Sequence, residues 1–281
     1  MSIRDFDVNI ITNEIEKLCI ESNYYVSDDI EKAFNKAIEK EEQEISKDLF
    51  NILIENTQIA KNENLPICQD TGMAVVFIEV GQEVHFIGNI EDAINEGVRR
   101  GYEKGYLRKS VVKDPVIREN TKDNTPAIIH YKIVEGDKVK VTVSPKGFGS
   151  ENMSKIAMLK PSEGIEGVKN FIINTVKTAG PNACPPMVIG VGVGGDFEKS
   201  AIMAKEGLLR EVGSKNKNEF WNEVEVELLE KINELNIGVG GFGGKTTALA
   251  IHINTFPTHI AGLPVAVNIG CHVTRHKEII L

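Results

Sequence analysis

The sequence predicts a mixed α/β (α+β) fold in a single large domain, residues 1–281, which begins with an all-helical layer. Two observations support this class. Apolar side chains recur at helical spacing through residues 1–63, and strand-like runs alternate with helical patterns through residues 64–281. The chain shows no internal repeat, low-complexity segment or evident linker. We therefore expect one structural unit.

Three helices are predicted in the N-terminal layer. Ser27 can cap the second, and two aspartates follow in its first turn, where the helix dipole favours acidic groups. The third helix repeats the same apolar periodicity over residues 45–53. The charged run Glu39–Glu42 is interpreted as a solvated helix face or turn without function. The apolar face of the second helix consists of Ile30, Ala33, Phe34, Ala37 and Ile38.

Strands and helices are then predicted in alternation. Only Glu135–Lys138 separates the second and third predicted strands, so we expect those two to form a β-hairpin. Ser150 is expected to begin a short helix that extends to Leu159. The strands are expected at residues 75–80, 128–134, 139–143, 187–193, 247–253 and 263–268. The longer helices are expected at about residues 90–104, 162–178, 199–212 and 219–235.

Composition excludes several classes of protein. The 281 residues carry 32 Lys and Arg against 41 Asp and Glu, a formal charge of −9, which argues against a nucleic-acid partner. The longest apolar runs, 185–193 and 261–269, are interrupted and fall short of the roughly 18 residues that span a bilayer. The first residues show no secretory signal pattern, so we expect a cytoplasmic protein.

The four cysteines differ in their surroundings. Cys19 lies in a helical apolar stripe and is expected in the core, whereas Cys68, Cys184 and Cys271 lie in turn-like segments rich in Pro, Gly and Asn. Long stretches of chain separate these three, unlike the paired spacing of structural zinc sites. Three thiolates can hold a cuboidal iron–sulfur cluster whose fourth iron stays open to substrate. For any one cysteine, packing as a small apolar side chain remains the alternative.

Two glycine-rich segments invite a nucleotide-binding interpretation. Gly190–Gly195 has the spacing of a dinucleotide fingerprint, but no second strand ends in an acidic residue about 20 residues further on. In Gly240–Thr247, Val239 stands where a P-loop requires its first glycine. We interpret the second segment as a tight turn or a close approach to a ligand, and keep nucleotide binding as a minor alternative.

Similarity to a known family rests on four short segments: Ile67–Gly72, Lys146–Asn152, Asn182–Pro186 and Asn268–His272. In combination they resemble the iron–sulfur hydro-lyases of the class I fumarase and L-tartrate dehydratase family. The resemblance extends from about residue 10 to the end of the sequence. It implies that residues 64–281 bind a 4Fe-4S cluster through Cys68, Cys184 and Cys271.

The resemblance also implies residues that hold the substrate. Arg108 matches a position whose guanidinium binds a substrate carboxylate. Arginine suits this role because it can donate two parallel hydrogen bonds to a carboxylate. Backbone amides at Gly147 and Gly149 would meet a second carboxylate at the start of the predicted helix. The plain alternatives are an exposed arginine and a glycine turn.

Three further residues are implied to contact the substrate. Gln69 and Asp70 directly follow the first cluster cysteine, and a carboxylate there can hold or pass the proton of a metal-bound hydroxyl. His259 matches a substrate-binding histidine. An Asx turn is the alternative for Asp70. The role of His272 is left open, and the other histidines, His85, His130, His252 and His276, are expected to be packed or exposed.

In this family a second catalytic part lies either in the same chain or in a separate β subunit. Because the sequence ends soon after Cys271, we expect an α subunit, with the general base on a β subunit and two αβ pairs in the assembly. Fumarate and L-malate are the first expected substrates, and L-tartrate the second. A non-catalytic iron–sulfur subunit is a further alternative. An open cluster should be lost to oxygen.

Overall fold

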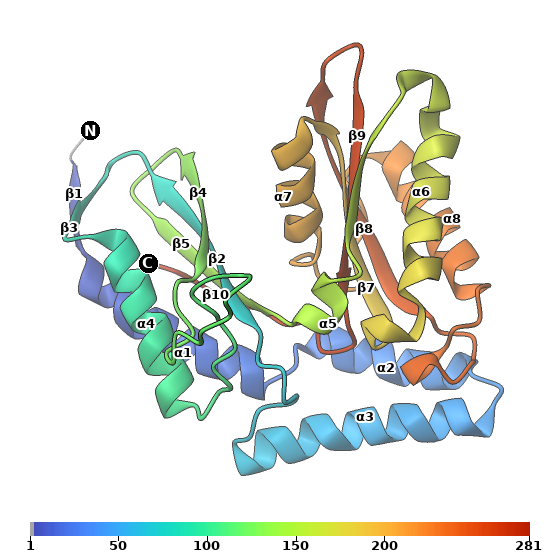
Figure 1. Ribbon diagram of the computed structural model, residues 1–281, viewed down its shortest axis with the longest axis horizontal. Helices are drawn as coiled ribbons and strands as arrows, with labels where there is room; N and C mark the ends of the chain where they lie inside the picture. The colour runs from blue at the N-terminus through green and yellow to red at the C-terminus, as the bar shows by residue number, and fades with distance from the viewer. Residues whose placement is uncertain (1–2) are drawn as a thin grey trace. The chain divides into compact units, whose positions relative to one another are not determined.

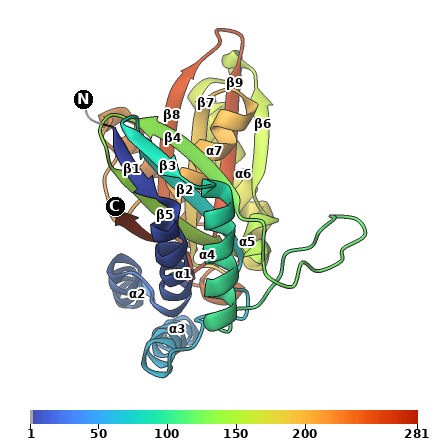
Figure 2. The same cartoon turned by 90° about the vertical axis from the view of Figure 1, so that its left-hand side faces the viewer.

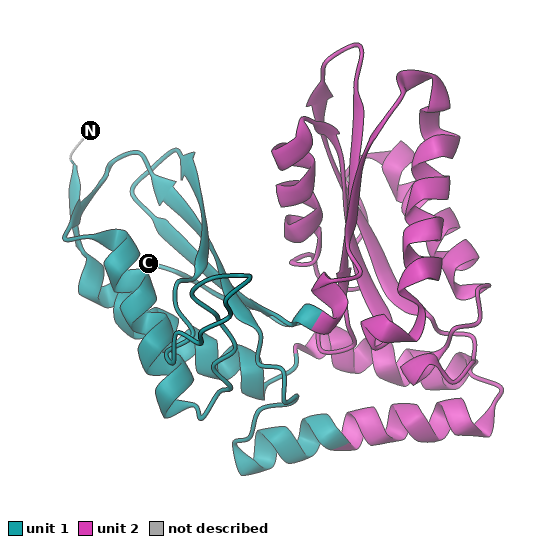
Figure 3. Cartoon of the chain, viewed as in Figure 1, with its two compact units in different colours: residues 1–26, 56–148, 275–281 teal, residues 27–55, 149–274 magenta. Residues whose placement is uncertain are grey.

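A computed structural model describes residues 3–281 and confirms the mixed α/β class (Figure 1). The chain divides into two compact units (Figure 3). Unit 1 comprises the N-terminal residues to Val26, Asn56–Phe148 and Arg275–Leu281, and unit 2 comprises Ser27–Glu55 and Gly149–Thr274. Each unit is described by itself. No helix among residues 3–281 is both long and apolar enough to cross a membrane.

The elements follow one another along the chain as Figure 1 labels them. The strands are β1 (Arg4–Asp7), β2 (Met73–Gly81), β3 (Val84–Ile87), β4 (Ile128–Val134), β5 (Val139–Lys146), β6 (Lys155–Leu159), β7 (Met187–Gly195), β8 (Ala248–Thr258), β9 (Leu263–Gly270) and β10 (Lys277–Ile280). The α-helices are α1 (Val8–Tyr24), α2 (Asp28–Lys40), α3 (Glu44–Glu63), α4 (Ile90–Lys104), α5 (Phe148–Glu151), α6 (Gly164–Ala179), α7 (Phe197–Gly207) and α8 (Glu219–Asn233). Short 3₁₀ helices are η1 (Pro161–Glu163), η2 (Gly180–Ala183) and η3 (Val239–Gly241).

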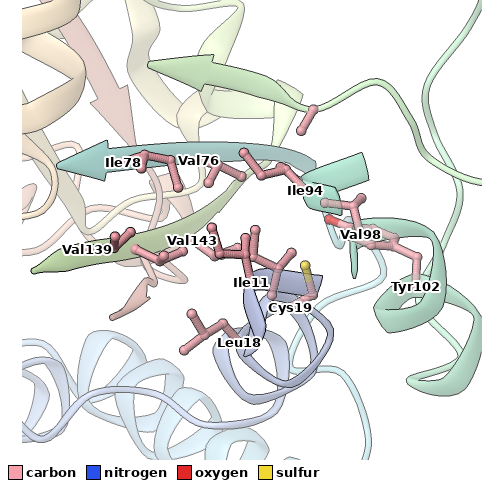
Figure 4. Close-up of a cluster of buried hydrophobic side chains, with 14 of the residues drawn as sticks. Ile11, Leu18, Cys19, Val76, Ile78, Ile94, Val98, Tyr102, Val139 and Val143 are labelled. Carbon is pink, nitrogen blue, oxygen red and sulfur yellow. The ribbon is translucent and has the colours of Figure 1, made fainter. Parts of the chain in front are cut away.

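Unit 1 packs helices α1 and α4 against a four-stranded sheet of order β10-β5-β2-β4. A separate parallel pair joins β1 to β3. The core between the sheet and the two helices contains Cys19, which is fully buried as expected (Figure 4). The helices approach closely because Gly101 has no side chain: a Cβ there would lie 2.8 Å from the Cβ of Cys19.

The expected β-hairpin of β4 and β5 is wrong. Both strands instead flank β2, which runs parallel to β4 and antiparallel to β5. β2 is buried along most of its length, whereas β4 is largely exposed, so burial favours β2 in the interior of the sheet. The connection after β4 crosses the end of β2 at Gly81, where a Cβ would lie 2.2 Å from the carbonyl oxygen of Gly136.

The three helices expected in the N-terminal residues are confirmed. β1 precedes the three expected helices, and α1 belongs to unit 1 whereas α2 belongs to unit 2. Helices α2 and α3 pack through Phe34 and Phe50, whose ring centroids are 6.0 Å apart.

Unit 2 is built on a sheet of order β6-β9-β7-β8, with α7 on one face and α6 and α8 on the other (Figure 1). The glycines of the segment that has the dinucleotide spacing lie within β7. A Cβ at Gly190 would lie 2.0 Å from the carbonyl oxygen of Ala204, and one at Gly192 would lie 2.0 Å from that of Ser200. These glycines therefore admit α7 to the sheet, and the strand–loop–helix geometry of a dinucleotide site is not formed there.

The charged run after α2 is not wholly solvated. Glu41 is buried, and its carboxylate accepts hydrogen bonds from the backbone N–H groups of Lys245 (2.9 Å) and Thr246 (2.8 Å). Ser46 Oγ donates to the carbonyl oxygen of Gly243 at 3.0 Å. The second glycine-rich segment is thus held by the α2–α3 connection, which supports its interpretation as a turn.

The buried His252 should make the stability of the protein depend on pH. Burial, reinforced by the charge of Arg210, lowers the pKa of His252 from 6.5 to about 4. Between these values the unfolded chain binds more protons than the folded one, so stability is fully present above pH 6.5 and is lost as the pH falls toward 4. We expect this one group to account for about 3 kcal/mol over that window.

Urea unfolding at several pH values measures this effect. The variant His252→Gln should flatten the decline between pH 6.5 and 4 relative to the wild-type chain. Equal slopes in the two proteins would contradict the assignment.

Candidate functional site

In unit 1 the loop after α3 holds a thiol beside a carboxylate. The backbone N–H of Asp70 donates to Cys68 Sγ at 3.4 Å, and the same Sγ lies 3.5 Å from Gln69 Oε1. The Asp70 carboxylate accepts backbone N–H groups on both oxygens, from Gly72 at 3.0 Å and from Phe148 at 2.9 Å. The loop therefore fixes the orientation of the Asp70 side chain relative to the Cys68 thiol.

The end of β5 meets this loop at Gly147. A Cβ on Gly147 would lie 3.0 Å from Asp70 Oδ2, so glycine permits the close approach. The expected helix from Ser150 to Leu159 is wrong, because α5 is only one turn and β6 pairs with β9. The N–H of Phe148 is used by Asp70, so this turn is not an open anion site. Gly149 lies in unit 2, where a Cβ would be 3.9 Å from the carbonyl oxygen of Asn182, in the turn before Cys184.

The segment that contains Arg108 is hydrogen-bonded to the same loop. Thr71 Oγ1 donates to the carbonyl oxygen of Arg108 at 2.9 Å, while the Arg108 side chain is exposed. Asn124 is fully buried and links the two segments: its Nδ2 donates to the Gly72 carbonyl at 3.2 Å, and its Oδ1 accepts the backbone N–H of Ser110 at 2.7 Å. The structure thus joins Cys68, Gln69, Asp70, Gly147 and Arg108 within unit 1.

In unit 2 two cysteines far apart in sequence lie at one end of the sheet. Cys184 precedes β7 and Cys271 follows β9, and these strands pair with Val188 opposite Gly270. His272 contacts the carbonyl oxygen of Cys184 through its backbone N–H at 3.2 Å and through Nδ1 at 3.1 Å. The question left open for His272 is thereby answered in part, since its ring packs on the Cys184 turn.

His259 is not brought to these cysteines. It lies in the connection between β8 and β9, at the end of the sheet opposite to Cys184 and Cys271. Strand β9 separates the two ends by about 23 Å, at roughly 3.3 Å per residue. Within unit 2 His259 and Cys271 therefore cannot contact the same small ligand.

One basic residue that the sequence did not indicate contacts the Asp70 loop. Arg275 is 4% exposed, and its Nη2 donates to the backbone carbonyl of Asp70 at 2.7 Å. Its Nε is buried and has no hydrogen-bond partner among the described residues. The signal in the sequence is only a basic residue shortly after Cys271, in a segment without helical or strand periodicity.

The three cysteines outside the core have the donor chemistry that an iron–sulfur cluster uses. No group of three or more His, Cys, Asp or Glu side chains is arranged to hold an ion within residues 3–281. Cys68, Cys184 and Cys271 are nonetheless thiols outside the core, and in unit 2 the turns of Cys184 and Cys271 are joined through His272. Soft thiolates suit iron–sulfur clusters. Cys19 is unsuitable, because burial raises the pKa of its thiol to about 12.

Thiol labelling under native conditions should separate these two kinds of cysteine. In the protein without a bound cluster, we expect an alkylating reagent to modify Cys68, Cys184 and Cys271, because these side chains are at least partly exposed. Cys19 should react only after unfolding, since it is buried and its pKa is raised to about 12. Peptide mass spectrometry would show the sites, and early labelling of Cys19 would contradict this result.

Comparisons with known proteins point to one family. A family model described as fumarate hydratase (fumerase) matches residues 12–280. A Methanocaldococcus jannaschii protein with the provisional name L(+)-tartrate dehydratase subunit alpha is 40% identical over 272 residues, covering 94% of this chain and 95% of that protein. An Escherichia coli protein named L(+)-tartrate dehydratase subunit alpha is 29% identical over 277 residues, covering 98% of this chain and 91% of that protein.

Proposed function

Because the chain belongs to the fumarate hydratase (fumerase) family, we propose that it is the α subunit of a two-subunit hydro-lyase acting on a small hydroxylated dicarboxylate. L(+)-tartrate is the first candidate substrate, and L-malate with fumarate the second. This order reverses the expectation from the sequence, because the relatives named above are tartrate dehydratase subunits. The observation that carries the proposal is one loop in which the Cys68 thiol accepts the backbone N–H of Asp70 and the Asp70 carboxylate is fixed by two backbone N–H groups.

Three cysteines are proposed to hold a 4Fe-4S cluster: Cys68 from unit 1, and Cys184 and Cys271 from unit 2. When bound, the cluster would supply an open iron that acts as a Lewis acid toward a substrate hydroxyl. The pairing of the Cys184 and Cys271 turns through His272 supports this donor set.

The other residues would bind and orient the substrate. The exposed guanidinium of Arg108 can take one carboxylate in bidentate geometry, and the Gln69 side chain can donate a further hydrogen bond. Gly147 and Gly149, which carry no side chain, would leave space for the second carboxylate. Asp70 would hold the proton at the substrate hydroxyl, in a position fixed by its two backbone bonds. The base on the adjacent carbon is expected on the β subunit.

Anaerobic reconstitution with iron and sulfide, followed by dehydration assays on L(+)-tartrate and L-malate, tests this function. The chain alone should bind the cluster and turn over little of either substrate, and adding its β subunit should restore activity. Full activity of the isolated chain would overturn the two-subunit proposal. A cluster with no activity in the complex toward either substrate would favour the non-catalytic iron–sulfur subunit instead.

The position of His259 predicts a site shared between copies of the chain. Since β9 separates it from Cys271, His259 can act only on a substrate bound to another copy. Two inactive variants, Asp70→Asn and His259→Ala, should therefore complement each other when co-expressed with the β subunit. One composite site can then contain both intact residues.

Assays of purified mixed assemblies measure this complementation. Activity well above that of either variant alone is expected. Mixed assemblies no more active than the parent variants, or a fully active His259→Ala, would contradict the shared site.

A further inference from the structure

Exposed apolar side chains concentrate on the segment between α4 and β4. The most exposed large apolar side chains of the described chain are Ile260 (91%), Tyr106 (90%), Val116 (85%) and Ile117 (81%). Three of these four lie in residues 106–127, here called the arm, which projects from unit 1 in Figure 2. Val116 and Ile117 are adjacent and lie at its tip.

The arm is ordered by its own hydrogen bonds. Its two sides meet where the N–H of Lys113 donates to the carbonyl of Glu119 at 2.7 Å. At the tip, Asp114 Oδ1 accepts the N–H groups of Ile117 (2.7 Å) and Val116 (2.8 Å), which lower the pKa of Asp114. The two apolar side chains are therefore presented by a preorganised backbone, which reduces the entropic cost of binding.

The charges of the arm leave a cationic surface. Glu119 pairs with Lys113, and Asp123 accepts a hydrogen bond from Arg99 at 3.1 Å, so these carboxylates are engaged within unit 1. The third carboxylate of the arm, Asp114, accepts two backbone N–H groups at the tip, and the arm carries five basic side chains against three acidic ones. Among the described residues no ion pair engages the basic side chains Arg108, Lys109, Arg118 and Lys122. An apolar tip flanked by positive charge fits an apolar recess with an acidic rim.

The base of the arm is continuous with the candidate site. Asn124 and Thr71 bond the arm to the loop that carries Cys68 and Asp70, and Arg108 lies within the arm itself. A partner that binds the arm therefore lies next to the candidate site, to which it would add further residues.

We propose that the arm docks onto the β subunit, with Val116 and Ile117 buried in an apolar recess of that subunit. The inference rests on the two-subunit function proposed above. The β subunit is favoured over a second copy because the β subunit must complete the site at the base of the arm. The other most exposed apolar side chain, Ile260 beside His259, lies in unit 2 and remains available for contact between copies.

The test measures the affinity of the full-length chain for its β subunit by titration calorimetry. The double variant Val116→Ser/Ile117→Ser should weaken binding about 100-fold, since two apolar side chains would no longer be buried. The matched control Ile133→Ser removes a side chain that is 68% exposed on β4 of the same unit, and should leave affinity unchanged. Arg118→Glu should weaken binding most at low salt.

The possible outcomes test the docking of the arm separately from the two-subunit function. If the wild-type chain does not bind the β subunit, the two-subunit function fails. If the wild-type chain binds and the double variant binds equally well, the arm inference is overturned. It is also overturned if the double variant keeps its β-subunit affinity but loses self-association in sedimentation experiments, because the arm would then contact a second copy. Unchanged thermal unfolding of the double variant would show that it folds.

Discussion

Replacing Cys184 by serine is expected to abolish cluster binding and, with it, activity of the assembled enzyme. Serine is similar in size to cysteine, and two hydrogen bonds of this turn are made by the backbone: the Cys184 N–H donates to the Pro181 carbonyl, and the Cys184 carbonyl contacts His272. The fold of unit 2 should therefore survive, while one of three thiolate ligands is lost. Iron and sulfide content, visible absorbance and dehydration rate measure the effect.

Cys19→Ala is the matched control for this variant. It also removes one thiol, but from the core of unit 1, where the side chain packs beside Gly101 (Figure 4). We expect a loss of about 1–2 kcal/mol of unfolding free energy with the cluster retained. A Cys184→Ser protein with full iron content and activity, or a Cys19→Ala protein that folds without a cluster, would contradict the assignment of ligands.

Elements with a strong local pattern could be predicted from the sequence. The bounds of α4 and β4 agree with the expected 90–104 and 128–134, because apolar periodicity and turn residues mark both. Where the local sequence pattern was weaker, pairing between strands distant in sequence determined the secondary structure. Lys155–Leu159, expected to continue a helix from Ser150, becomes β6 because β9 offers it an antiparallel partner. The division into two units also escaped prediction, since the chain passes between them without a linker in its composition.

The candidate site was likewise predictable in part from the sequence. The segments around Cys68, Cys184 and Cys271 could be selected because cysteines among Pro, Gly and Asn are poor core candidates. The close approach of Gly147 to Asp70 could not be predicted, because it depends on where strand β5 ends relative to the Cys68 loop. The position of His259 depends on the direction and length of β9, which its immediate neighbours in sequence do not specify. Asn124 was missed because its function is to join two loops.

Arg275 is expected to separate activity from stability. Its guanidinium is buried without a carboxylate partner among the described residues, and its Nε makes no hydrogen bond there, so the bond to the Asp70 carbonyl compensates only part of the desolvation cost. Replacing it with methionine removes that cost but leaves the Asp70 carbonyl without its donor. These effects oppose each other, so the unfolding free energy should change by less than about 2 kcal/mol.

Activity should respond much more strongly to Arg275→Met. The Arg275 bond holds the backbone of Asp70, and a displacement of about 1 Å in a positioned group can reduce the rate about 100-fold. We expect that loss in kcat with a smaller change in KM, and partial rescue by Arg275→Lys, which can still donate to the carbonyl. Steady-state kinetics on the complex with the β subunit, corrected for cluster content, would measure the separate effects on kcat and KM.

Arg4→Met provides the comparison that decides between a positioning role and a general need for arginine in unit 1. Arg4 also donates only to backbone carbonyls in its hydrogen bonds, to Asp137 at 2.8 Å and Leu281 at 3.2 Å, but neither carbonyl belongs to the Asp70 loop. Its loss should lower stability modestly and leave kcat unchanged. If Arg4→Met and Arg275→Met reduce kcat equally, or if Arg275→Met lowers activity only in proportion to unfolded protein, Arg275 does not position Asp70.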